Sequence, residues 1–528
     1  MRLSVSDAID NFIGALSPKR GLERRFQRAK YNRVKSFESK AKSRSEQYAA
    51  AKTNRMTGDW APVNSNVNDI IGSSSVNVRA RVRQLVRDFP YFSNALNRIV
   101  DHTVGAGITF QSKAQTTSGD LDKKAIQQIE DAFSFWADDA DVSRKLHLYE
   151  IMQLAKRMDV ECGEFLIVKR WRNDKRYIPY CLQIYEADWL TTQFDRGYGS
   201  QMATAKPNMP RTDIYQGIEY DRYTGEVIAY YFVDPDSWGA TIKIDAADVI
   251  HGFKTLRPGQ LRGISSFAPG VLLAHDLADY MDAEIDAAKM AAKYLAFVKT
   301  PNTQARQLGL STETSDDETQ YIDEMENAII EYLNPGEEVE IASNPRPGSN
   351  FPPFVRLVLC MLSVTTGVPY EILSGDYQGL NYSTSRTARN DFIYHLRPIS
   401  ARHIRQFCTR AVMPAIDYAV AAGKLNLPGY FSNPYRYLKA EWQPPGMESI
   451  DPLRETKAWI DSVSAKIRSP QEIIRARGRD PEEVLREIQQ WQEWMDEMGL
   501  APEAVSTSTA NNPAAVANQR SLKVLHGK

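Results

Sequence analysis

Residues 264–296, near the middle of the chain, have the strongest helical pattern in the sequence. Apolar and charged side chains recur on two sides of the predicted helix: the apolar stripe is Leu277, Met281, Ile285 and Ala288, and the charged stripe is Asp279, Asp282, Asp286, Lys289 and Lys293. A helix with two such faces suits a ring or a bundle in which one face stays in solvent. An ordinary surface helix fits the same pattern, so the alternative stays open.

A small mixed module separates this helix from a second one. Residues 297–351 are expected to hold an acidic helix and two short strands, at 317–333, 297–299 and 339–341. The second helix lies within 352–374 and is expected to stop at Gly367. This arrangement predicts two helical stalks that carry the small module at their ends.

Residues 76–263 predict helices followed by a β-layer that packs on them. Helical patterns cover 76–104 with a break at Pro90, 121–137 and 147–160. Strand patterns cover 108–111, 165–169, 181–185, 214–220, 227–233 and 249–251, with a hairpin turn at 221–225. Residues 1–75 form a polar arm that ends in an irregular strap at 57–75. The first 60 residues hold 14 Lys or Arg and 6 Asp or Glu, which fits a nucleic-acid arm or a helical arm that docks on a neighbour.

A polar loop, residues 375–383, precedes a long helix within 384–448. The loop could touch a DNA backbone or merely connect two helices. Thr384 or Ser385 is expected to cap the helix, Pro398 to kink it and Gly423 to end it, before a strand at 437–442. Residues 449–500 predict a compact helical module, and 501–528 predict a disordered tail.

Composition and motifs exclude several functional classes. The chain has 528 residues, more than one hydrophobic core usually spans, so several subdomains are expected. Its net charge of −1 argues against a protein that holds DNA by phosphate contacts. No run of apolar residues approaches the ~18–20 that a membrane span needs. Four scattered cysteines indicate neither a zinc site nor disulfides. HExxH, GxxxxGK[ST] and GxSxG patterns are absent. A two-metal nuclease site could use the carboxylates at 276, 279, 282, 284 and 286, but these crowd one helix. We predict no catalytic, cofactor-binding or metal-binding residue.

Five groups of residues between about 75 and 500 resemble, in order, the lambda-type portal proteins of tailed phages. They are Arg79–Asp88 with Pro90-Tyr91 and Val104–Ile108; Gln260–Ser265; Gly367–Asp376 with Asn381–Arg386; Trp442 with Pro444-Pro445 and Ile450–Pro452; and Gly478–Val484. No single segment decides the resemblance, but the ordered set is specific.

The resemblance implies an α+β, mainly helical subunit of a dodecameric ring at one capsid vertex of the virion, assembled in the host cytoplasm. Its parts would be a β-rich wing (76–263 and 384–448), two stem helices (264–296 and 352–374), an α/β clip (297–351), a tunnel loop (375–383) and a helical crown (449–500). The ring would pass double-stranded DNA during packaging and ejection. Its other expected partners are the terminase large subunit, the head–tail adaptor, and the major capsid and scaffold proteins.

The resemblance also selects candidate site residues. Acidic and polar walls let DNA slide, because a basic lumen would hold it through counterion release. The candidates to face DNA are Asp279, Asp282, Asp286, Asp376, Tyr377, Gln378, Asn381 and Tyr382, and those to pair between subunits are Arg386, Arg389 and Arg397. The alternatives are a metal-dependent nuclease or terminase-like enzyme, and a minor capsid or baseplate component without a channel.

Overall fold

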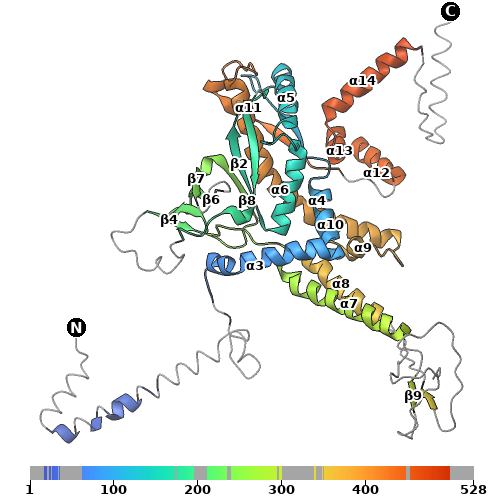
Figure 1. The fold of residues 1–528 in the computed structure, drawn as a ribbon. Helices are drawn as coiled ribbons and strands as arrows, with labels where there is room; N and C mark the ends of the chain where they lie inside the picture. Colours follow the sequence, from blue (N-terminus) through green and yellow to red (C-terminus); the bar gives the residue numbers. More distant parts are fainter. Residues whose placement is uncertain are drawn as a thin grey trace, which may run out of the picture. The chain divides into compact units, whose positions relative to one another are not determined.

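The computed structural model describes residues 64–446 and 452–499, apart from 173, 175, 196–210, 235–239, 294–296, 300–337, 341–347 and 349, together with Pro62 and parts of 17–35. The chain divides into two units, Met1–Asn66 and Val67–Lys528, and the elements below belong to the second (Figure 1). The helix expected at 317–333, the tail at 501–528 and most of the arm lie outside the described residues.

Two consecutive helices begin the second unit. α3 spans Val67–Asp88 and α4 spans Pro90–Thr103, so the break at Pro90 is confirmed. The strap expected up to residue 75 is wrong, because α3 already begins at Val67. Asn68 explains the difference: its side chain donates to the Gly259 carbonyl and accepts from the Leu261 N–H, both at 2.8 Å. These tertiary contacts outweigh the weak helix propensity of the Asn, Ser and Gly residues there.

The β-layer consists of two antiparallel sheets. The first has the order β3 (Tyr180–Tyr185), β2 (Glu164–Trp171), β8 (Val249–Phe253); the second has the order β4 (Thr212–Tyr215), β5 (Ile218–Asp221), β6 (Val227–Val233), β7 (Thr241–Asp245). The single strand expected at 214–220 is wrong, because Gln216 and Gly217 both have positive φ and turn the chain between β4 and β5. β7 was not expected. The turn at 221–225 is confirmed, since the Gly225 N–H donates to the Asp221 carbonyl at 2.8 Å.

Helices α5 (Lys123–Asp138) and α6 (Leu148–Glu161) agree with the sequence pattern to within two residues at each end. Together with the three-stranded sheet they form one apolar core, in which the Trp136 indole donates to the Tyr180 carbonyl at 2.9 Å. β1 (Thr109–Ser112) pairs with β11 (Ala440–Gln443). The strand expected from 437 therefore begins three residues later, since Tyr437 follows a short 3₁₀ turn.

Helices α7 (Val271–Lys293) and α8 (Phe351–Thr366) pack against each other and share a second core with α3, α4 and α10 (Figure 1). α8 ends at Gly367 as expected, with φ of 74°. The expected apolar stripe of α7 is partly wrong: Leu277 is buried, but Ile285 is 48% exposed and Glu284 is buried instead. Steps of four residues drift by about 40° around a helix of 3.6 residues per turn, so the stripe rotates away from the core.

Two short strands, β9 (Phe297–Lys299) and β10 (Glu338–Glu340), lie between α7 and α8 in the sequence, and they pair with each other in antiparallel fashion. They agree closely with the strands expected at 297–299 and 339–341. After α8, the short helix α9 (Tyr370–Ser374) leads into the polar loop.

The long helix after the loop is α10 (Tyr382–His403), which continues through a π-helical segment, Ile404–Cys408, into α11 (Thr409–Ala421). Pro398 lies inside α10 without ending it. The expected cap is wrong, because Asn381 caps the helix and Thr384 is three residues further on. The Gly stop agrees with the structure, since the chain turns at Gly423 with φ of 67°.

The last described helices are α12 (Pro452–Ser464), α13 (Pro470–Ala476) and α14 (Pro481–Glu497). They confirm the helical character expected at 449–500. They do not form the expected compact module, because Pro481 is the one buried residue among the described residues of these helices. Short helices that leave their apolar side chains in solvent build no core of their own.

Candidate nucleic-acid interface

The acidic side chains of α7 lie on its exposed side. Asp279 and Asp286 are 70% and 71% exposed, and Asp282 is also exposed. His275 Nδ1 lies 3.4 Å from Asp279 Oδ2, and Lys289 Nζ lies 3.0 Å from Asp286 Oδ1. Exposed pairs of this kind contribute less than about 1 kcal/mol and are screened by salt. The expected acidic face is therefore present and accessible, and it extends over several turns of the helix.

Asp376 shapes the polar loop. Its Oδ1 accepts from the Gln378 N–H at 3.0 Å, and its Oδ2 accepts from the Tyr370 hydroxyl at 3.2 Å. The preceding helix α9 is fixed to α4, because the Asn94 amide donates to the carbonyls of Ile372 and Leu373 at 2.8 and 3.0 Å. The loop therefore begins at a defined place beside α4.

The other loop candidates are all exposed, and one of them also caps a helix. Asn381 Oδ1 accepts from the Thr384 N–H at 2.9 Å and is occupied as the helix cap. Tyr377 and Tyr382 are 62% and 40% exposed, and Gln378 is exposed. Two phenol groups and the side-chain amides of Gln378 and Asn381 are therefore accessible on the loop.

The three arginines of α10 lie in different surroundings. Arg386 and Arg397 are exposed, whereas Arg389 is half-buried. The Arg397 guanidinium lies over the Tyr394 ring, 4.9 Å from its centre. Pairing of these arginines between copies stays a prediction, because the structure describes a single copy.

A buried ionic cluster, missed in the sequence, connects the β-layer to α7. It consists of Arg79 of α3, Glu164 of β2, His251 of β8 and Arg262, nine residues before α7. The Arg262 Nε lies 2.9 Å from both Glu164 oxygens, and the His251 Nε2 lies 3.1 Å from Oε2. Arg79 Nη2 lies 3.6 Å from Oε1. We call these four residues the Glu164 cluster.

The Glu164 cluster keeps its carboxylate charged. Burial alone would raise the pKa of Glu164, but the charge of Arg262 and hydrogen bonds from His251 and Arg262 outweigh burial and hold that pKa well below its usual range. The remaining guanidinium donors of Arg262 reach the carbonyls of Gln216 and Ala187, both at 3.0 Å. The cluster thus joins four separate segments around one carboxylate.

Two glycines let the backbone pass close to this cluster. A Cβ at Gly163 would lie 2.1 Å from the Ile264 carbonyl carbon, and one at Gly263 would lie 2.1 Å from the Gly163 oxygen. Ser265 then donates to the Val160 carbonyl at 2.7 Å, just before the chain enters α7. A glutamate at the start of an apolar strand and an arginine before a glycine were the available sequence signals, but they did not reveal the pairing.

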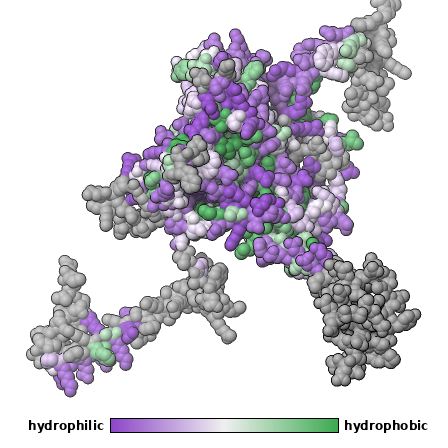
Figure 2. Space-filling model, viewed as in Figure 1, coloured by the Kyte–Doolittle hydropathy of each residue, from purple (hydrophilic) through white to green (hydrophobic). Residues whose placement is uncertain are grey.

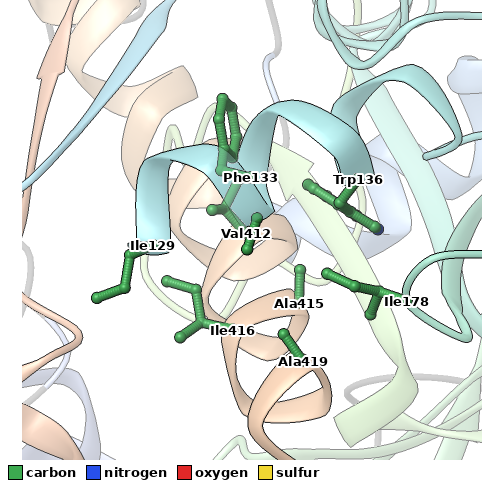
Figure 3. A pocket seen from close by; sticks show the side chains of 9 residues that line it. Ile129, Phe133, Trp136, Ile178, Val412, Ala415, Ile416 and Ala419 are labelled. Atoms are coloured by element: carbon green, nitrogen blue, oxygen red, sulfur yellow. The ribbon is translucent and has the colours of Figure 1, made fainter. Parts of the chain in front are cut away.

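Two features of the described residues bear on the enzyme alternative. Within them, no group of three or more His, Cys, Asp or Glu side chains is placed to hold a metal ion. Figure 3 shows a pocket between α5 and α11, in which Phe133 and Trp136 lie opposite Val412, Ala415 and Ile416. Apolar and aromatic side chains line this pocket, so it supplies no acid, base or nucleophile.

The described helices also lack a candidate membrane span, because none is both long and apolar enough to cross a bilayer. Hydrophilic residues cover most of the face seen in Figure 2.

Comparisons with known proteins point to one family. Residues 53–397, about two thirds of the chain, match the family described as phage portal protein, lambda family. The probable portal protein of Halomonas phage phiHAP-1 is 25% identical over 462 residues, which cover 84% of this chain and 85% of that protein. Portal protein B of Escherichia phage lambda is 21% identical over 490 residues, which cover 84% and 89%. Among solved structures, a chain from the neck of an empty gene transfer agent particle has a TM-score of 0.45 and 13% identity, and the match covers 80% of this chain and 96% of that one.

Proposed function

The chain belongs to the lambda family of phage portal proteins, and on that premise we propose that twelve copies close into a ring at one capsid vertex of the virion. The ring is the channel for double-stranded DNA during packaging and ejection. The family match over residues 53–397 carries this proposal, because that range contains α7, α8 and the polar loop.

An apolar stripe on α8 supports the self-association. Its members recur every three or four residues, and they are Phe354 (47% exposed), Leu357 (59%), Met361 (51%) and Val364 (84%). An exposed apolar row on a soluble protein usually marks an interface. A neighbouring copy in a ring would cover this stripe in every subunit at once.

The acidic side of α7 supports a channel that does not grip DNA. In a ring of identical copies, one aspartate per copy becomes a continuous belt of negative charge. Such a belt repels phosphates from the wall, whereas a basic belt would bind them through counterion release. Asp279, Asp282 and Asp286 form this lining.

The polar loop narrows the channel. Tyr377, Gln378 and Tyr382 meet the passing duplex through hydroxyl, amide and aromatic groups, while Asp376 and Asn381 hold the loop in shape. The exposed Arg386 and Arg397, together with Arg389, pair with acidic groups of the neighbouring copy instead of binding DNA.

The remaining assignments follow the family resemblance. Residues 297–351 form the clip that meets the terminase large subunit and later the head–tail adaptor, and α12–α14 form the crown. The rest of the outer surface meets the major capsid and scaffold proteins. The ring performs no chemistry of its own.

Electron microscopy of the purified full-length protein tests the ring. We expect hollow rings with an opening wide enough for duplex DNA. Particles without a hole would contradict the proposal and favour a channel-less minor capsid component. Incubation with plasmid DNA and Mg²⁺ or Mn²⁺ tests the enzyme alternative, since cleavage would favour a nuclease and intact plasmid is the expected result.

Charge reversal on α7 tests the lining. We expect Asp282→Lys/Asp286→Lys rings to assemble normally but to package DNA more slowly, because the lumen then attracts phosphate. The control is Asp120→Lys/Glu226→Lys, which changes the charge equally at two exposed positions outside α7. Equal packaging rates for the two variants would contradict the assignment of the lining.

A further inference from the structure

Helix α14 carries an apolar seam with the spacing of a coiled coil. Val484, Ile488, Trp491, Met495 and Met498 follow one another at intervals of four, three, four and three residues. Met498 is the C-cap of α14, and the other four lie inside the helix. Alternating steps of four and three keep apolar side chains on one line and are typical of helices that pack against another helix.

Three of the five seam residues are open to solvent among the described residues, and Val484 and Met495 are half-buried. Trp491 and Met498 are 61% and 74% exposed, and Ile488 is 47% exposed. Leu485 and Trp494 beside the seam are exposed as well. A soluble chain that leaves two tryptophans and three aliphatic side chains uncovered on one helix presents an interface.

Helix α12 presents a second, shorter seam. Leu453 and Ile460 lie seven residues apart on it, and they are 85% and 60% exposed. Ile467, seven residues further on and just beyond the helix, is 77% exposed. The same heptad interval therefore occurs in both helices, and both seams keep exposed apolar side chains within the described part of the copy.

The two seams carry opposite charge. Residues 481–499 of α14 and its end contain six acidic residues and one basic residue, Arg486. Residues 452–468 of α12 and the turn after it contain four basic and two acidic residues. Lys457, four residues after Leu453 on α12, flanks the line through Leu453 and Ile460, at a position that sets partner choice in helical pairs, whereas Lys466 lies in the turn beyond the helix with a φ of 57°.

The base of the module is fixed while the seams stay uncovered. Arg475 of α13 lies 3.5 Å from Glu441 of β11, and the Arg477 guanidinium lies over the Trp459 ring at 4.5 Å. A Cβ at Gly446 would lie 2.2 Å from the Arg477 carbonyl carbon, so the backbones are in close contact there. The seams are thus carried by helices whose common base is attached to the body of the same copy.

We propose that the α14 seam of one copy docks on the α12 seam of the neighbouring copy. This inference rests on the proposed function, because it takes the second copy from the ring. An α14–α14 contact would place acid against acid and, being isologous, would produce pairs. A contact between two different faces is heterologous and repeats around a ring, and each copy carries both faces.

Cross-linking between two variants tests the contact. Ile460→Cys and Ile488→Cys are made separately in a Cys360→Ser background, because the other three cysteines are buried. The two proteins are assembled alone and as an equal mixture, and the purified rings are treated with a short bis-maleimide. We expect cross-linked dimers in the mixture, at about a quarter of the junctions if copies mix at random around a heterologous ring.

Each other outcome is informative. Dimers from Ile488→Cys alone would overturn the proposal in favour of an α14–α14 contact, and hollow rings without any cross-link would overturn it while leaving the ring intact. Failure to form hollow rings by electron microscopy is the separate failure of the proposed function. A third variant carries both Ile460→Cys and Ile488→Cys in one chain. A cross-link within this chain, identified by the mass of a single copy, would show that the two seams meet within one copy and would also overturn the proposal.

Charge exchanges added to the same two cysteine variants sharpen the test and leave the other residues of the apolar seams unchanged. Lys457→Glu/Lys466→Glu should lower the cross-link yield in mixed rings several-fold, because it places acid opposite α14. Adding Glu483→Lys/Glu487→Lys, at two positions that flank the α14 seam, should restore the yield, and the restoration should weaken at high salt. A yield that ignores both changes would contradict the charge complementarity.

Discussion

The Glu164 cluster and the module of α12–α14 represent two extremes of burial in this chain. Glu164, His251 and Arg262 are at most 8% exposed, and their charges are matched within one copy. On α14, by contrast, Trp491 and Met498 are mostly exposed and meet no core. The first region is complete in a single copy. The second becomes complete only with a partner. Substitutions in the first region should therefore change the stability of a single copy, and those in the second should change the association of copies.

Replacing Glu164 by Gln should have the largest effect. The change leaves the buried guanidinium of Arg262 without its counter-charge, and removing one member of a buried ion pair costs about 3–5 kcal/mol. Urea denaturation followed by circular dichroism measures the loss in the free energy of unfolding. The control is Glu219→Gln, whose carboxylate pairs with the half-exposed Lys243 and should matter by less than about 1 kcal/mol. Equal losses for the two variants would contradict the importance of the cluster.

Substitution of two glycines separates the strain of a positive φ from the crowding of an added methyl group. Gly163→Ala should cost several-fold more than Gly225→Ala, although both residues have positive φ, of 91° and 73°. An alanine at position 225 meets nothing within 4 Å and carries only the left-handed penalty of about 1–2 kcal/mol. An alanine at position 163 also collides with the backbone of Ile264. Differential scanning calorimetry gives both melting temperatures, and similar shifts would show that the junction yields to the extra methyl group.

The sequence predicted those features that local periodicity determines. α5, α6 and α8 agree with the pattern closely, because each alternates apolar and polar side chains at helical spacing over three or more turns. The acidic face of α7 was predicted for the same reason. The break between β4 and β5 was not, because it depends on the positive φ of Gln216, which the apolar pattern does not encode.

Contacts between distant segments lay beyond the sequence. Glu164 meets Arg262 and His251, which are 98 and 87 residues away in the chain. The loop roles of Asp376 and Asn381 depend on hydrogen-bond geometry that residue type alone leaves open. The expected compactness of 449–500 failed for another reason: its apolar residues indicate packing, but not whether the partner belongs to the same copy.

Histidine titration extends the comparison to pH. Burial, together with the charges of nearby Lys156 and Arg402, lowers the pKa of His403 to about 3, against the opposing charge of Asp159. The unfolded chain binds a proton near pH 6.5 while the folded chain does not, so His403 reduces stability as pH falls from about 6.5 to 3, by at most about 1.4 kcal/mol per pH unit.

His403→Phe should flatten this part of the profile of unfolding free energy against pH, measured by urea denaturation at several pH values. A phenyl ring suits the site, because the His403 ring lies 5.5 Å from Phe407 and 5.8 Å from Phe165. The other buried charges also lose stability in acid, so the difference between variant and wild type isolates His403.

Truncation on α14 should have the smallest effect on a single copy. Ile488 is 47% exposed, so Ile488→Ala should cost unassembled protein from gel filtration less than about 1 kcal/mol, whereas Leu362→Ala in the second core should cost about 2–5 kcal/mol. In assembled rings Ile488→Ala should cost more stability than in a single copy, because a neighbour's α12 would then cover Ile488. Comparison of the melting temperatures of unassembled and ring fractions measures this difference. If Ile488→Ala lowers both equally, the helix is already buried within one copy, and the distinction between the self-sufficient cluster and the dependent module disappears.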